Sequence, residues 1–308
     1  MSAERELDAA GITGPQLREA YRRCRALNAE HGRTYFLATR ALSPGQRPAV
    51  HALYGFARRV DDIVDDVHSG LSRKVEGLAA AEAVLASALD RGTSSDPVVA
   101  ALLDTVRRHD IPAVHFRDFM ASMRMDLTVT DYATRAELTR YVHGSAAVIG
   151  LQVLPVLGTV VPREEAEPAA AALGIAFQLT NFIRDVREDL DRDRVYLPAD
   201  ELAAFGVDRD RLLWARDAGR VDDRIRAALR DQVHRTRQVY ARALPGIAML
   251  APRSRPCVST AYRLYGRILD LVEEADYDVL ARRVTVSTGR RLAVALPAFA
   301  RAVLARTA

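Results

Sequence analysis

Cysteine, aromatic residues and net charge are all scarce in this sequence of 308 residues. It has 2 cysteines, 6% aromatic residues, and 44 basic against 40 acidic side chains, for a formal net charge of +4. Cys24 and Cys257 are too few for a disulfide framework and lie in no metal-binding spacing, so we expect a reducing, cytoplasmic location. No block of basic residues is interleaved with aromatics, and we expect no nucleic-acid partner.

Long hydrophobic runs are also missing. The most apolar stretch, residues 146–162, is interrupted by Gln152 and Pro155. A membrane span needs about twenty mostly apolar residues, so we predict a buried core helix here. The N-terminus lacks the basic-then-apolar order of a secretion signal.

The last residues, 285–308, form a basic amphipathic segment, in which Arg290, Arg291, Arg301 and Arg306 lie among Leu, Val, Ala and Phe. Such a segment is either an ordinary packed helix with a solvated rim or a helix that rests on an anionic bilayer. The sequence leaves both readings open. We therefore expect at most a peripheral contact with the inner face of the membrane, and the oligomeric state is left undetermined.

The chain is rich in apolar residues, at 49%, and in helix-forming Ala, Leu and Arg. That composition excludes a disordered chain. Period-two runs of β-branched residues are nearly absent, which argues against a sheet. We predict one all-α domain over residues 1–308, with residues 1–19 as an N-terminal extension.

A first acidic cluster lies in residues 49–67, AVHALYGFARRVDDIVDDV. Apolar residues recur there at three and four positions and predict one helical stripe: Val50, Leu53, Ala57, Val60, Val64 and Val67. At about 100° per residue, four side chains line one edge of this stripe: Tyr54, Arg58, Asp61 and Asp65. Asp62 and Asp66 point towards solvent. Carboxylates one turn apart repel unless a cation such as Mg²⁺ lies between them; the alternative is a solvated acidic face.

A second acidic cluster lies in residues 174–190, GIAFQLTNFIRDVREDL. On one continuous helix, four polar side chains would follow a single line beside an apolar face: Gln178, Asn181, Asp185 and Asp189. The last three of these offer oxygen ligands on successive turns.

The two clusters together are more informative than either one. If the two helices face each other, their carboxylates surround a polar mouth above a central apolar cavity. Such a site suits a ligand with a diphosphate head and a hydrocarbon tail. Bound Mg²⁺ would make the diphosphate a good leaving group, and the cavity would keep water away from a carbocation.

Several segments resemble one known family. They are HGRTYFLATR at 31–40, ALYGFARRVDDIVDD at 52–66, SMRMDL at 122–127, YVHGSAAVIG at 141–150, QLTNFIRDVREDLDRDRVYLP at 178–198 and, more weakly, YRLYGRILDLVEEADYDVLARRV at 262–284. Over about residues 20–290 the chain resembles the squalene/phytoene synthases, the head-to-head trans-prenyltransferases, and most of all their bacterial phytoene synthases.

The resemblance implies a fold and a reaction. The fold is the all-α isoprenoid-synthase bundle, and the cofactor is Mg²⁺, with Mn²⁺ as a substitute. The reaction joins two geranylgeranyl diphosphates through a cyclopropyl diphosphate to phytoene and releases diphosphate, as in carotenoid biosynthesis, and no NADPH is expected. A C15 version, which joins two farnesyl diphosphates to presqualene diphosphate, squalene or dehydrosqualene, is the alternative.

The resemblance also implies roles for individual residues. The metal ligands would be Asp61, Asp65, Asn181, Asp185 and Asp189. The substrate diphosphates would be held by His31, Arg33, Thr34, Tyr54, Arg58, Gln178, Arg184, Tyr265 and Arg283. Tyr141 would lie near the reacting carbons, where Phe182 offers a second aromatic face, and Asp126 would lie at the edge of the site.

Two further expectations concern access and chain length. We expect the polar segment 191–196 to close over the mouth. From its modest size, we expect Thr39 to leave room for a C20 tail.

Two hypotheses from other classes stay open. One is a Mg²⁺-dependent prenyl diphosphate hydrolase with the same acidic clusters. The other is a non-catalytic helical protein that binds a partner, which would be expected to have lost the aspartates that this chain keeps.

Overall fold

The computed structural model describes residues 2–281; the side chains of residues 33–35, inside a helix, lie outside this description. The helices run in the order α1(Ala3–Ala9), α2(Pro15–His31), α3(Arg33–Thr39), η1(Pro44–Gln46), α4(Arg47–Asp65), α5(Leu71–Arg91), α6(Pro97–His109), α7(Val114–Met125), α8(Arg135–Val142), η2(His143–Ala147), α9(Val148–Leu157), α10(Arg163–Arg184), α11(Val186–Asp191), α12(Ala199–Ala203), α13(Arg209–Ala218), α14(Asp223–Ala243), α15(Gly246–Met249) and α16(Arg255–Glu274). In this part of the chain only two isolated β-bridges form and no strand. The all-α expectation is confirmed.

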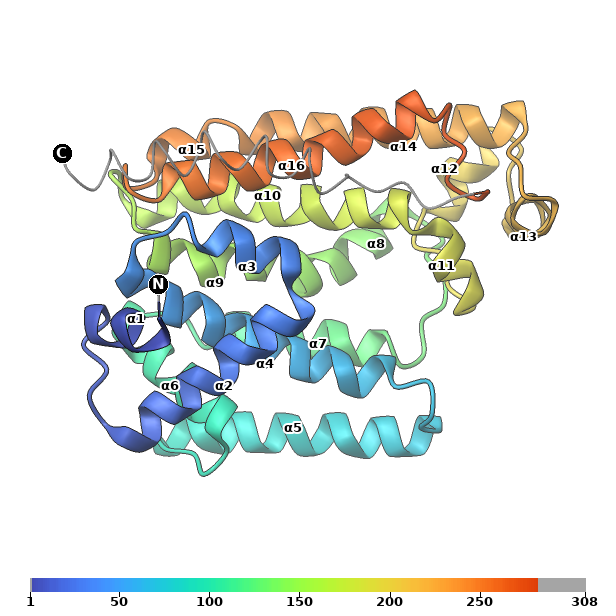
Figure 1. The fold of residues 1–308 in the computed structure, drawn as a ribbon. Coiled ribbons are helices and arrows are strands. Elements are labelled where there is room, and N and C mark those ends of the chain that lie inside the picture. Colours follow the sequence, from blue (N-terminus) through green and yellow to red (C-terminus); the bar gives the residue numbers. More distant parts are fainter. Residues whose placement is uncertain (1, 282–308) are drawn as a thin grey trace.

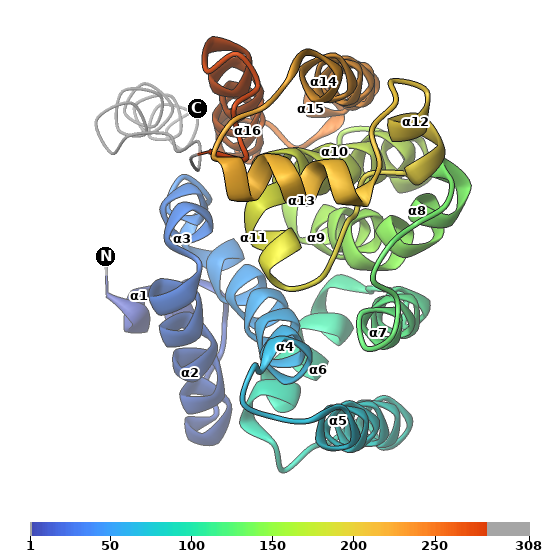
Figure 2. The ribbon, with the colours of Figure 1, turned by 90° about the vertical axis from the view of Figure 1, so that its right-hand side faces the viewer.

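Two large hydrophobic clusters hold the bundle together. One gathers around α2, α4 and α6, and includes Phe56 and Phe116. The other gathers around α10, α14 and α16, and includes Phe182 and Leu269. In Figure 1, α14 and α16 cover α10 at the top, α4 and α9 lie below it, and α5 lies at the bottom. Figure 2 looks along the bundle onto the end where α4 and α11 finish.

Helix α4 carries the first acidic cluster. Of its predicted stripe, Leu53, Val60 and Val64 are buried, and Val50 and Ala57 are half-buried. The helix ends at Asp65, because Asp66 adopts extended backbone geometry. Val67 therefore lies beyond the helix and is 77% exposed, so the prediction that it extends the buried stripe is wrong.

The second acidic cluster does not lie on one continuous helix, contrary to the prediction. Helix α10 ends at Arg184, Asp185 leaves helical geometry at φ −103° and ψ 15°, and α11 then begins. The backbone N–H groups of Asp185 and Asp189 still bond the carbonyls of Asn181 and Asp185, at 2.8 and 2.9 Å. The chain therefore bends at Asp185 while the polar side chains keep their four-residue spacing.

The central apolar helix is interrupted by a turn of π-helix, η2, between α8 and α9. The predicted core helix is confirmed as far as Leu157, after which Gly158 turns the chain with a φ of 73°. Among residues 2–281, no helix is both long enough and apolar enough to cross a bilayer. The basic segment 285–308 lies outside the described residues.

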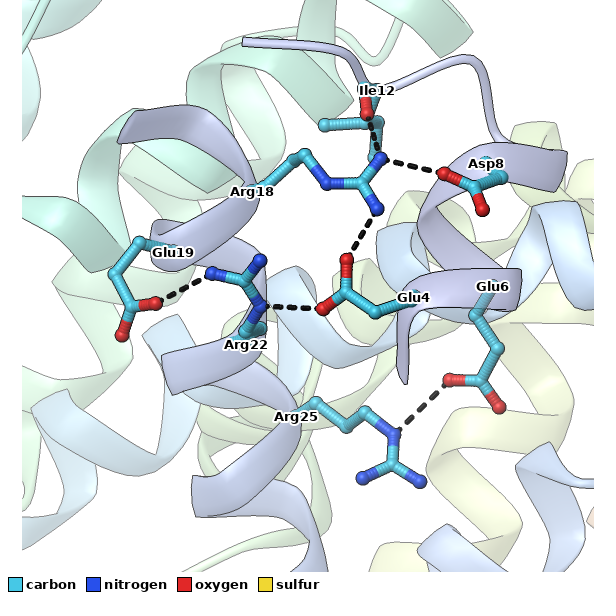
Figure 3. Close-up of polar contacts among 8 residues, drawn as sticks. All are labelled: Glu4, Glu6, Asp8, Ile12, Arg18, Glu19, Arg22 and Arg25. Atoms are coloured by element: carbon cyan, nitrogen blue, oxygen red, sulfur yellow. Dashed lines mark hydrogen bonds and ion pairs between the residues drawn. The ribbon is translucent and has the colours of Figure 1, made fainter. Parts of the chain in front are cut away.

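Residues 1–19, expected as an extension, contribute α1, which packs onto α2 (Figure 3). Arg18 donates to Asp8 at 2.8 Å and to the carbonyl of Ile12 at 2.7 Å. Exposed pairs of this kind stabilise little. The buried pair between Glu6 and Arg47 of α4, at 2.9 Å, is the more consequential contact, because loss of one partner would leave a buried charge.

The fold predicts a sharp contrast between two glycine substitutions. A Cβ at Gly144 of η2 would overlap the Asp118 carbonyl and the Ser122 hydroxyl of α7. Gly144→Ala should therefore lower the free energy of unfolding by about 1–3 kcal/mol, measured by denaturant titration. A Cβ at Gly266 of α16 would meet no described atom within 4 Å, so Gly266→Ala should be neutral or stabilise by up to about 1 kcal/mol. Equal effects would contradict the close packing of η2 on α7.

Candidate active site

Two neighbouring chambers open between α4 and α10. The first, which we name the acid chamber, has a volume of about 380 Å³ and is lined by both acidic clusters. The second, the apolar chamber, has about 220 Å³ and is walled mainly by Ala, Leu, Val and Ile side chains. The chambers share the wall residues Val50, Ser145, Ile149, Val153, Gln178 and Asn181. The site thus has a polar head region that adjoins an apolar tail region.

The acid chamber brings together most of the residues that the sequence singled out. It is lined by Tyr54, Asp61, Asp65, Asp126, Tyr141, Gln178, Asn181, Phe182, Asp185 and Asp189. The rows on α4 and on α10–α11, about 120 positions apart in sequence, line the same cavity. The expectation that they face one mouth is confirmed.

Three carboxylic acids in the acid chamber have raised pKa values. Burial, with repulsion from Asp65, raises the pKa of Asp61 to about 7. Burial, with repulsion from Asp185, raises that of Asp189 to about 7. Burial raises the pKa of Asp126 to about 6, although Arg194 and a bond from Tyr141 oppose this. A desolvated carboxylate among others is costly to ionise, so full ionisation of these acids calls for a counter-charge in the chamber.

Part of that counter-charge comes from the segment 191–196. Arg192 lies 3.5 Å from Asp65, and Arg194 lies 3.7 Å from Asp65 and 3.9 Å from Asp126. Arg194 also donates to the Asp126 backbone carbonyl at 2.6 Å. The segment therefore reaches from α11 to the acidic end of α4, where the sequence predicted a closing element.

Aromatic rings form one wall of the acid chamber. The rings of Phe182 and Tyr196 stack with centroids 4.2 Å apart, and Tyr141 lies 5.6 Å from Tyr196. The Tyr141 hydroxyl donates to Asp126 at 2.8 Å. Burial keeps the pKa of Tyr141 well above 10, so this phenol stays protonated.

Four other predicted residues do not line the acid chamber among the described residues. Arg58 pairs with Asp62 at 2.5 Å, whereas the sequence analysis placed its side chain on the same edge as Asp61 and Asp65. Arg184 pairs with Asp185, with Nε 2.8 Å from Oδ1, and this bond keeps the Arg184 pKa raised although burial opposes it.

The remaining two lie beside the helices that frame the chamber. Tyr265 stacks on Phe177 at 4.3 Å. His31 ends α2, with its side chain 33% exposed. The side chains of Arg33 and Thr34 lie outside the described part, as does Arg283.

Three polar lining residues were not found from the sequence: Asn28, Ser145 and Gln152. Asn28 is fully buried on α2 and bonds His51 at 2.9 Å. Burial lowers the pKa of His51 to about 3, so this histidine stays neutral. The only sequence signal for these three residues is a polar side chain within an apolar helical face. Many hydrogen-bonded core residues show the same pattern, so it does not identify a site.

The residues of the acid chamber fit a divalent cation. The Oδ1 atom of Asn181 is buried and has no hydrogen-bond partner among residues 2–281. In the same part of the chain, no three His, Cys, Asp or Glu side chains are gathered closely enough to hold an ion alone. Mg²⁺ typically takes a few carboxylate oxygens and fills its remaining positions with water and phosphate oxygens. An ion that arrives with a phosphorylated ligand therefore suits these donors.

An all-α bundle with an acid-lined mouth beside an apolar chamber suits a ligand that has a diphosphate head and a hydrocarbon tail. The model of the squalene/phytoene synthase family matches residues 28–290. The chain belongs to the squalene/phytoene synthase family.

Several relatives are similar over nearly their whole length. A phytoene synthase of Arthrospira platensis is 39% identical, with 89% of this chain and 90% of the relative covered. Phytoene synthase 2 of Solanum lycopersicum chloroplasts is 38% identical, with 94% and 92% covered. A 15-cis-phytoene synthase of Synechococcus elongatus is 36% identical, with 90% and 91% covered.

Solved structures share the fold. A dehydrosqualene synthase superposes with a TM-score of 0.83 at 24% identity, with 92% of this chain and 96% of that chain covered. A squalene synthase from Alicyclobacillus acidocaldarius gives 0.77 at 24% identity, with 87% and 98% covered.

The raised pKa of Asp61 predicts a pH-dependent effect on stability. Between about pH 4 and pH 7 the unfolded chain loses this proton before the folded chain does, so the stability of the metal-free protein falls as pH rises. Asp61→Asn removes the free-energy cost of ionising this buried carboxyl in the folded protein. It should raise the melting temperature in EDTA at pH 8 by roughly 3 °C and have little effect at pH 4. Asp62→Asn, at an exposed residue, is the control; an equal effect of Asp61→Asn at both pH values would refute the assignment.

Proposed function

We propose that this protein is a phytoene synthase, which condenses two geranylgeranyl diphosphates head to head, through a cyclopropyl diphosphate, to phytoene and diphosphate. The observation that carries the proposal is that the acid chamber adjoins the apolar chamber and shares wall residues with it. A prenyl diphosphate is polar at one end and apolar at the other, and the two chambers have the same order.

The acid chamber would hold the diphosphate heads. Asp61, Asp65, Asn181, Asp185 and Asp189 would bind Mg²⁺, or Mn²⁺ in its place, and the bound ions would neutralise the diphosphate so that it leaves readily. Gln178 and Tyr54 can donate hydrogen bonds to phosphate oxygens, and the planar guanidinium groups of Arg192 and Arg194 can turn from Asp65 to the same oxygens.

Further diphosphate contacts are proposed from the family resemblance. They would come from His31, Arg33, Thr34, Arg58, Arg184, Tyr265 and Arg283. Arg58 would have to exchange Asp62 for phosphate, and Arg184 would have to exchange Asp185.

The aromatic wall would face the reacting carbons. Loss of diphosphate leaves an allylic cation, which the rings of Tyr141, Phe182 and Tyr196 can stabilise through their π faces. The protonated Tyr141, fixed by its bond to Asp126, presents its ring without a nucleophilic phenolate.

The apolar chamber would hold the hydrocarbon tails and exclude water. Thr39 is buried in its wall, at 4% exposed. Its modest size favours a C20 tail over a C15 tail, in agreement with the names of the relatives. The final step needs no reductant for phytoene, so NADPH is not part of the proposal.

The proposal includes a single domain and a cytoplasmic location. Because phytoene is insoluble in water, a peripheral contact with the membrane would help its release.

The proposed reaction predicts a defined product. Purified protein with Mg²⁺ and geranylgeranyl diphosphate, without NADPH, should yield a C40 hydrocarbon identified by mass, with release of diphosphate. Farnesyl diphosphate should be a poorer substrate. Exclusive use of farnesyl diphosphate would overturn the assignment of a C20 substrate. Formation of a free prenyl alcohol or monophosphate would identify a hydrolase instead.

The acidic rows predict loss of activity without loss of fold. Asp61→Ala and Asp185→Ala should each lower kcat by more than roughly 1000-fold, because each removes a charge that would hold the ion at the leaving group. Circular dichroism should remain helical. Asp62→Ala, on the same helix but outside the chamber lining, should keep most of the activity; full activity in either of the first two variants would break the metal assignment.

A further inference from the structure

The boundary between the two chambers identifies where the substrate bond must break. If the diphosphate lies in the acid chamber and the hydrocarbon tail in the apolar chamber, the C1–O bond between them lies at the shared wall. Only three polar residues belong to that wall among the described lining residues: Ser145, Gln178 and Asn181. Gln178 and Asn181 already have proposed partners, whereas Ser145 has none.

The hydroxyl of Ser145 is buried and has no hydrogen-bond partner within residues 2–281. A helical serine ordinarily donates to the carbonyl four residues earlier, which here is that of Tyr141. The Ser122 hydroxyl of α7 already donates to that carbonyl, at 2.8 Å. The Tyr141 carbonyl, which is the usual local acceptor, is therefore already occupied by Ser122. The hydroxyl of Ser145 is left to donate to another group.

The cause of this arrangement lies in the packing of η2 on α7. Gly144 allows the two backbones to approach so closely that no Cβ would fit between them. That close approach brings the Ser122 hydroxyl to the Tyr141 carbonyl. Ser145 directly follows Gly144 in the chain. Turns of π-helix are frequent at functional sites, and an unpaired buried hydroxyl is unfavourable unless a ligand supplies its partner.

We infer that Ser145 is a catalytic residue whose hydroxyl donates a hydrogen bond to the diphosphate oxygen attached to C1. When the C1–O bond breaks, its electron pair stays on that oxygen, and the hydrogen bond strengthens as negative charge develops there. The serine keeps its proton and forms no covalent bond. This inference rests on the proposed function.

The Ser145→Ala variant distinguishes a catalytic role of the hydroxyl from a role in packing. Because the lost hydrogen bond acts mainly in the transition state, kcat should fall roughly 10- to 100-fold while KM changes little. The melting temperature should stay the same or rise, because the substitution removes an unpaired buried hydroxyl. Ser145→Thr, which keeps a hydroxyl, should recover most of kcat. Steady-state kinetics and thermal unfolding of all three proteins measure these effects.

The control is Thr236→Ala on α14. Thr236 is also buried, at 2% exposed, but its hydroxyl donates to the Gln232 carbonyl at 2.8 Å, and it lies outside both chamber linings. It should keep kcat. If Ser145→Ala retains full kcat, or loses kcat together with stability and without rescue by threonine, the inference is overturned and the proposed function stands. If the unaltered protein releases no diphosphate from geranylgeranyl diphosphate, the proposed function fails and the inference fails with it.

Discussion

The repulsion among carboxylates around one partly buried cavity is the constraint on which this structure depends. Asp61, Asp65, Asp185 and Asp189 line the acid chamber, and burial raises the pKa of two of them to about 7. Desolvated like charges oppose folding. Positive charge that enters the chamber would offset this free-energy cost.

The fold tolerates this charge because the two halves of the bundle are stabilised elsewhere. Separate hydrophobic clusters lie on either side of the chambers, so neither depends on closing the cavity. Arginines provide partial compensation at the mouth: Arg192 and Arg194 approach Asp65. The pair between Arg192 and Asp65 is exposed and therefore weak, so Arg192 can exchange partners when a diphosphate arrives.

Close backbone contacts position the wall between the chambers. Gly144 packs against α7, and Gly174 of α10 packs so closely on the backbone of Ala146 that a Cβ would overlap it. These contacts hold η2 between α7 and α10, where Ser145 meets both chambers. The shape of the boundary thus follows from small residues on η2 and α10, and the chemistry follows from the few polar groups placed among them.

The sequence by itself determined what depends on local geometry. Helical spacing placed Asp61 and Asp65 on one edge of α4, and it kept Asn181, Asp185 and Asp189 together even though the helix bends at Asp185. The sequence also predicted that the two acidic rows belong to one site, because their combination in one chain is specific to a family.

Only the tertiary structure decided which partner each group meets. Arg58 has several carboxylates within reach along α4 and pairs with Asp62, which periodicity cannot resolve. Ser145 looks like any helical serine until Ser122, from another helix, occupies the Tyr141 carbonyl. Periodicity reports the face on which a side chain lies; the distance to a group on another helix is set by how the helices pack, and no local pattern encodes it.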